Sequence, residues 1–211
     1  NTDGNLGNGT TTNRRTPVPV AGGHTFAKLA VGGFHACGVT LDGKALCWGR
    51  NTNGQLGDGT TTNRSTPTAV AGGQRFVDIT AGTVHTCAIT SDGSAFCWGR
   101  NESGELGDGT FVNRTTPVAV SGGHAWRVVL AGGNVTCGVA ASGAAYCWGV
   151  NDFGQLGNSA AIRSSQPVPV QGGVAFEYVV PGLYHTCGVA TNGQALCWGG
   201  RGYGQLGAGN T

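Results

Sequence analysis

The sequence repeats itself every fifty residues. Pairs of cysteines ten residues apart recur at that interval, and Trp-Gly follows each second cysteine. The period runs without insertion or deletion, giving four full units: 1–50, 51–100, 101–150 and 151–200. Residues 201–211 restart the unit in the register of residues 1–11. A fixed period of this length is typical of an array of one small structural unit, so we expect residues 1–211 to form a single repeat domain.

Glycine shows what kind of unit this is. The chain has 41 glycines among 211 residues, against an average of roughly 7%. Glycine inside a helix costs about 1 kcal/mol relative to alanine, which excludes a mainly helical chain. A hydrophobic share of 39% and five tryptophans exclude a disordered linker, and glycine has no period of three as in collagen. An all-β chain with many tight turns fits best.

The second unit illustrates the expected architecture. It opens with a loop in which Gly54, Gly57 and Gly59 permit positive φ and Leu56 can point inward as a buried plug. Alternation of apolar and polar residues then predicts short strands. We expect four of them: Thr68–Val70, Arg75–Ala81, His85–Thr90 and Ser94–Trp98. Four short strands per repeat predict an all-β β-propeller, with one blade per unit.

The repeat also resembles a known family. The segment GGFHACGVTLDGKALCWGRNTNGQLGDGTTTNRSTPTAV contains Gly-x-x-His, Asp-Gly, Cys-Trp-Gly, Asn-x-x-Gly-Gln-Leu-Gly and Thr-Pro in order. It resembles the regulator of chromosome condensation (RCC) repeat, and the likeness covers the chain in four copies. Members typically build seven-bladed propellers, which at this period need about 350 residues. Four blades leave three arrangements open: a small closed ring, completion by another chain, or an open array.

The cysteine pairs flank a predicted hairpin. In the first unit Leu41-Asp42-Gly43 suits a three-residue turn with glycine in the left-handed region, which places Cys37 opposite Cys47. Facing Cβ atoms lie about 4.5–5.5 Å apart, near the spacing of a disulfide. The same register predicts four bonds: Cys37–Cys47, Cys87–Cys97, Cys137–Cys147 and Cys187–Cys197.

Eight reduced, buried cysteines are the alternative, and intracellular relatives carry cysteine here without oxidation. The even number and the absence of an unpaired cysteine favour disulfides. Disulfides in turn favour an extracellular or cell-surface location, whereas reduced thiols would indicate an intracellular one.

Metal binding is weakly supported. His35, His85 and His185 each stand two residues before a cysteine, but Val135 occupies this register in the third unit. A histidine with two facing cysteines supplies three ligands, and structural zinc takes four. We therefore expect hydrogen-bonded structural histidines. The loop at 51–54 has no bidentate Glu for calcium, so no metal and no cofactor are expected.

The sequence contains no recognisable catalytic motif. It lacks Gly-x-Ser-x-Gly, His-Glu-x-x-His and a Gly-Lys-Ser/Thr phosphate loop, so we do not expect an enzyme. Its net charge is +2 without a basic run, which disfavours nucleic acid as a partner. No apolar stretch reaches the ~18 residues of a membrane span, so membrane insertion is not expected.

Five asparagines lie in glycosylation sequons: Asn8, Asn63, Asn101, Asn113 and Asn134. In a glycosylating secretory pathway, Asn63 and Asn113 are the expected acceptors because they fall in exposed loops. Unmodified turn asparagines explain the same residues equally well.

Together these features favour a non-enzymatic, extracellular or cell-surface scaffold stapled by disulfides. Its partners would be itself or another protein. Because residues 201–211 duplicate the start of the chain, the repeat array can join the next copy head to tail, as a ring or a filament. The resemblance implies an alternative: nucleotide exchange on a small GTPase with chromatin binding, or a regulatory propeller segment of a larger intracellular protein.

Overall fold

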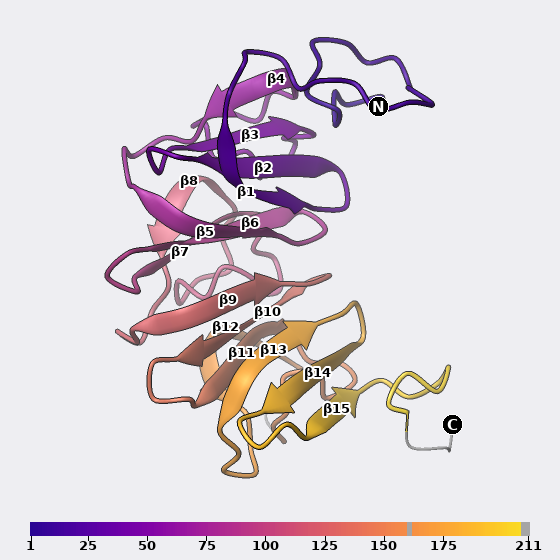
Figure 1. Ribbon diagram of the computed structural model, residues 1–211. Coiled ribbons are helices and arrows are strands. Elements are labelled where there is room, and N and C mark those ends of the chain that lie inside the picture. Colours follow the sequence, from indigo (N-terminus) through magenta and orange to yellow (C-terminus); the bar gives the residue numbers. More distant parts are fainter. Residues whose placement is uncertain (160–161, 208–211) are drawn as a thin grey trace.

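The protein is an array of four small antiparallel sheets. The computed structural model describes residues 1–159 and 162–207, and no helix occurs among them. The sheets follow one another in chain order, with the first and fourth at opposite ends of the array (Figure 1). This arrangement confirms the all-β propeller-blade prediction.

Three blades have four strands each, and the fourth has three. Blade 1 consists of β1 (Phe26–Val31), β2 (His35–Thr40), β3 (Ala45–Gly49) and β4 (Arg64–Ala69). Blade 2 consists of β5 (Phe76–Ala81), β6 (His85–Thr90), β7 (Ala95–Gly99) and β8 (Arg114–Ala119). Blade 3 consists of β9 (Trp126–Ala131), β10 (Val135–Ala140), β11 (Ala145–Val150) and β12 (Arg163–Pro169). Blade 4 consists of β13 (Phe176–Pro181), β14 (His185–Ala190) and β15 (Ala195–Gly199).

The blades do not coincide with the sequence units. The sequence predicts a strand at Thr68–Val70 within the second unit, whereas β4 spans Arg64–Ala69 and pairs with β3 of the unit before, Gly49 facing Arg64. A blade therefore takes three strands from one unit and its outermost strand from the next. The outermost position also explains why Pro67 is tolerated, because a proline on an edge strand removes no ladder hydrogen bond.

The cysteine hairpin has the predicted register. Cys37 faces Cys47 and Val39 faces Ala45, and Gly43 has φ of 82°. A second glycine is needed where the inner turns of neighbouring blades touch. A Cβ on Gly32 would lie 2.4 Å from the carbonyl oxygen of Gly82, and the next residue's N–H, on Gly33, donates to that same carbonyl at 3.1 Å. Close backbone approach thus links adjacent blades at their inner ends.

The hydrophobic core is divided among the junctions between blades. One buried cluster joins Cys37 and Cys47 of blade 1 to Phe76 and Ile79 of blade 2, with Leu56 from the connecting loop. Leu56 has no exposed surface, as predicted for the plug. Each blade thus buries its apolar face only against its neighbour, as expected of a repeat array.

Candidate functional site: the blade junctions

The disulfides lie at the blade junctions. All eight predicted cysteines are bonded, with none free: Cys37–Cys47, Cys87–Cys97, Cys137–Cys147 and Cys187–Cys197. The Cα atoms in each bond are 4.1 Å apart, as facing hairpin positions allow. The first three bonds are fully buried, and the fourth, on the uncovered side of blade 4, is half-buried. A disulfide therefore forms part of the surface on which the next blade packs.

A buried chain of hydrogen bonds crosses the same junctions. His35 Nε2 lies 2.7 Å from Thr86 Oγ1, and Thr86 Oγ1 donates to the carbonyl oxygen of Gln55 at 2.8 Å. Trp98 Nε1 donates to that same carbonyl at 3.0 Å. The chain thus ties blade 1, the glycine-rich loop and blade 2 together through side chains that have almost no contact with solvent.

The pattern recurs at the next junction and is altered at the third. His85 Nε2 lies 2.8 Å from Thr136 Oγ1, which donates to the Glu105 carbonyl. At the third junction Thr186 still donates to its loop carbonyl, that of Gln155, but Val135 replaces the histidine. His35 and His85 have the structural, hydrogen-bonded role expected from the sequence, whereas the sequence pattern does not indicate their threonine partners.

The bonding determines the tautomer of these histidines. Because Thr86 uses its only hydroxyl proton on Gln55, it must accept from His35, which places a proton on Nε2 and leaves Nδ1 bare. Nδ1 of His35 has no hydrogen-bond partner within residues 1–159 and 162–207. Burial lowers the pKa of His35 from 6.5 to about 4. Burial, and then the charge of His35, lowers that of His85 to about 3.

Glu105 is an unusual residue in the third loop. Gln55 and Gln155 occupy this register in neighbouring loops, where the side-chain oxygen accepts a backbone N–H two residues earlier. Glu105 accepts the same bond from Ser103, and its second oxygen is buried without a partner among the described residues, as is Nε2 of Gln55. Burial raises the pKa of Glu105. Here a carboxyl group accepts the backbone N–H that a glutamine amide accepts in the neighbouring loops. Burying an ionisable carboxyl group costs more desolvation free energy than burying a neutral amide.

The loop that begins at residues 51–54 is closed by its own side chains. Asn51 Nδ2 donates to Asp58 Oδ1 and to the carbonyls of Thr60 and Thr62. Asp58 also pairs with Arg64 at 2.8 Å. Burial alone would raise the Asp58 pKa, but hydrogen bonds from Thr60, Arg64 and Asn51 lower it overall. Among the described residues, no three histidine, cysteine or acidic side chains group as a metal site.

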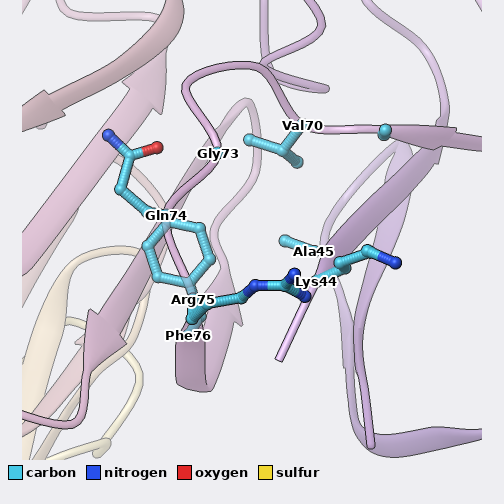
Figure 2. Close-up of a pocket in the computed structure, with 8 residues that line it drawn as sticks. Lys44, Ala45, Val70, Gly73, Gln74, Arg75 and Phe76 are labelled. Carbon is cyan, nitrogen blue, oxygen red and sulfur yellow. The ribbon is translucent and has the colours of Figure 1, made fainter. Parts of the chain in front are cut away.

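Shallow pockets recur at the outer rim of successive junctions. The first, about 220 Å³, has Ala45, Val70 and Phe76 in its wall and Lys44 and Arg75 at its mouth. In Figure 2 the Arg75 side chain extends toward Lys44, while that of Gln74 points away. The pockets in the same register at the next two junctions measure about 410 and 250 Å³. Their apolar wall is kept, but Ser94 and Ala144 replace Lys44, so the rim chemistry differs at each junction.

The sequons differ in accessibility. Asn101 is fully buried, and its Nδ2, the atom that would carry a glycan, donates to Asp108 and two carbonyls. Asn63 is exposed, but its Nδ2 donates to Asp3. Asn113 is exposed, with its Oδ1 accepting from Asn101 N. Asn8 and Asn134 are half-buried. Among the five, Asn113 offers the most available amide.

Sequence comparison finds one family along most of the chain. A profile described as the regulator of chromosome condensation (RCC1) repeat matches residues 42–89, 92–139 and 142–189, and a second profile of the same description matches 26–55, 76–105 and 179–205. No curated protein matches the chain in a search of full sequences.

Solved structures of propellers share the fold. Human WBSCR16 superposes with a TM-score of 0.85 at 23% identity, over 99% of this chain and 57% of that one. Prp20p of Saccharomyces cerevisiae, described by its binding to Gsp1p and histones, gives 0.78 at 24%, over 92% and 50%. The ectodomain of the Physcomitrella patens receptor kinase CR4 gives 0.59 at 25%, over 86% and 40%. The chain thus spans about half the length of the structures it matches.

Proposed function

Because the chain belongs to the regulator of chromosome condensation (RCC1) repeat family, we propose that it is a non-enzymatic propeller scaffold of the extracellular space or cell surface, whose uncovered end blades bind a second copy of the chain. The observation that carries this proposal is the position of the disulfides: the first three form part of the face on which the next blade packs, and the fourth lies on the same face of blade 4, where no blade of this chain covers it. The bonds hold that face in shape, and the repeat supplies a surface complementary to it.

The oxidised cysteines support the location. Four bonds using every cysteine are typical of proteins from oxidising compartments. The likeness to a receptor-kinase ectodomain points the same way. Among the described residues there is no helix long and apolar enough to cross a bilayer.

The first blade presents one half of a junction to solvent. Leu29 is 63% exposed and Val31 is 81% exposed. The residues in the register of Leu29 in blades 2 and 3, Ile79 and Val129, are 6% and 3% exposed because a preceding blade covers them. An apolar surface of this kind favours association.

The fourth blade presents the other half. Ala195 is exposed and the disulfide Cys187–Cys197 is half-buried, whereas Ala45 and Cys47, in the same register, are buried beneath blade 2. Packing of blade 4 on blade 1 of a second copy would repeat the junction already formed three times in the chain. This is a heterologous contact, which gives a ring if the rotation closes and a filament if it does not.

Two details refine how copies would meet. Residues 1–9 already pack on blade 1, with Trp48 Nε1 donating to the Asn5 carbonyl at 3.0 Å. Residues 201–207 of a neighbour would therefore have to displace that loop, and residues 208–211 lie outside the described chain. The sheet faces, rather than the duplicated segment, are the proposed contact. His185 would meet Ala36 instead of a threonine, so the junction between copies would lack the histidine–threonine hydrogen bond found at the first two junctions.

Sedimentation velocity over a wide concentration range tests the assembly. The wild type should form larger species as concentration rises. Leu29→Arg should remain monomeric, because it places a charge on a face that must be desolvated. Val77→Arg is the matched control: Val77 is 53% exposed and the next blade has Arg127 in its register. A wild type that remains monomeric throughout would contradict self-assembly.

A further inference from the structure

A small apolar patch lies in the middle of the array, on two adjacent loops and the first residue of β12. It consists of Phe111, Val112, Ile162 and Arg163, and we call it the loop patch. The three apolar side chains are 45%, 58% and 70% exposed, in that order. The guanidinium carbon of Arg163 lies 4.5 Å from the centroid of the Phe111 ring, which brings the two loops together.

The fold does not require these side chains. The first two units have Thr11-Thr12 and Thr61-Thr62 where the third has Phe111-Val112. The backbone role is the same in both cases: Asn51 Nδ2 donates to the Thr62 carbonyl, and Asn101 Nδ2 donates to the Val112 carbonyl. The side chains of Phe111 and Val112 face solvent at positions where the first two units have threonine. They therefore add exposed apolar surface without a packing benefit.

Arg163 is a departure of the same kind. The other units have asparagine in its register, and Asn113 Oδ1 accepts the backbone N–H of Asn101. In the fourth unit the Ile162 carbonyl takes over this bond from Asn151. The side chain at 163 is thereby released from its structural task and lies over Phe111 instead, a cation–π contact.

The charge around the patch is unbalanced. Arg163 donates to the backbone carbonyl of Glu102 at 3.0 Å but forms no ion pair within residues 1–159 and 162–207. The Glu102 carboxylate is already paired with Arg100 at 2.6 Å. Two guanidinium groups thus stand against one carboxylate. A net positive surface disfavours self-pairing of the patch and favours an acidic partner.

We propose that the loop patch is a docking site for a segment of a protein partner that presents a bulky apolar side chain beside a carboxylate. The apolar side chain packs against Phe111, Val112 and Ile162, and the carboxylate pairs with Arg163. Interface energy commonly concentrates on an aromatic residue and an arginine at the centre of such a patch. This site is separate from the end faces of blades 1 and 4, so it holds whether or not copies assemble.

The repeat supplies a clean test. Phe111→Thr/Val112→Thr restores residues that two other units have, and Arg163→Asn restores the asparagine of the other units. The control is Leu41→Thr, which removes a 74% exposed leucine from a hairpin tip and has Thr191 as its precedent. Thermal unfolding should be nearly the same for all four proteins.

The probe is a random twelve-residue peptide library displayed on phage, selected on oxidised wild type from a host that does not glycosylate it. Enriched peptides should carry Asp or Glu beside an aromatic or branched apolar residue. Their affinity should fall at least about tenfold for Phe111→Thr/Val112→Thr and stay unchanged for Leu41→Thr. Added salt should weaken binding to the wild type but not to Arg163→Asn, which lacks the guanidinium group.

Three results would overturn the proposal. The first is a selection that yields no peptide able to distinguish the wild type from Phe111→Thr/Val112→Thr. Sedimentation could show self-association that this double variant abolishes, which would assign the patch to a second copy. Vesicles of phosphatidylcholine and phosphatidylglycerol could bind the wild type and not the variant, which would assign it to a membrane surface. Loss of assembly in Leu29→Arg with peptide binding intact would separate this site from the proposed scaffold contact.

Discussion

His35 and Thr86 are bonded across the first blade junction, with 2.7 Å between Nε2 and Oγ1. The two residues stand fifty-one positions apart in the sequence, one in each of two consecutive blades. Since the threonine also holds the loop carbonyl of Gln55, one hydroxyl group connects three separate parts of the fold. The junction is therefore specified by polar as well as apolar contacts.

Thr86→Val should destabilise the protein more than Thr186→Val. Both substitutions remove a hydrogen bond to a loop carbonyl. Only Thr86→Val leaves a buried imidazole N–H unpaired, because Val135 occupies the histidine register opposite Thr186. We expect a difference of about 1–2 kcal/mol in the free energy of unfolding, measured by urea denaturation. Equal losses would show that the histidine bond does not contribute.

Stability should fall on acidification from pH 6.5 toward pH 4. The pKa of His35 is about 4 and that of His85 about 3 in the folded protein, below the ordinary 6.5. As the pH falls below 6.5, these two imidazoles bind protons in the unfolded chain but stay neutral in the folded one. The free energy of unfolding that they contribute above pH 6.5 is therefore lost as the pH falls. The full effect is roughly 3 kcal/mol for His35.

His35→Val supplies the matched variant for this pH dependence, because the third junction already combines Val135 with Thr186. Urea denaturation at a series of pH values should give a shallower decline for the variant between pH 6.5 and pH 4. The same slope in both proteins would contradict a buried neutral histidine at position 35.

Glu105→Gln should stabilise the protein at neutral pH. Burial raises the pKa of Glu105, so the folded state favours the protonated form and its contribution to stability is lost as the pH rises through that pKa. The amide of Gln55 and Gln155 avoids this penalty. The gain should disappear below the ordinary carboxyl pKa of 4.5. Asp152→Asn, at an exposed position, is the control in thermal denaturation across pH.

The disulfide of blade 4 should be the first to react with a reductant. Cys187 and Cys197 are half-buried, whereas the cysteines of the other three bonds have no exposed surface. Brief treatment with dithiothreitol, alkylation and peptide mass spectrometry should label these two cysteines first. If copies assemble as proposed, the Cys187–Cys197 bond should react more slowly at high protein concentration. Equal labelling of all eight cysteines would contradict the difference in burial.

Local features of the fold could be predicted from the sequence. The spacing of Cys37 and Cys47 about Gly43 specifies the hairpin, because a short turn fixes which residues face each other. The blade boundary could not be predicted the same way. The pairing of β3 with β4 spans the long loop between Gly49 and Arg64, so no short turn fixes its register.

The junction chemistry was harder still to predict. Thr86 and Thr136 follow the preceding histidine by fifty-one residues, but Ala36 and Val135 break the pattern in two of the four units. Only the packing of consecutive blades shows which histidine meets which threonine. Similarly, Phe111 and Arg163 are separated in the chain by four strands, β8 to β11, and become neighbours only in the folded array.

The central claim is that the blade faces are built on disulfides in the protein as it occurs in its natural source. The most direct measurement is the intact mass of that protein after iodoacetamide treatment in denaturant, without reductant. The account predicts no added alkyl group, because all eight cysteines are paired. A mass increase corresponding to eight alkyl groups would contradict it and place the protein among the intracellular members of the family.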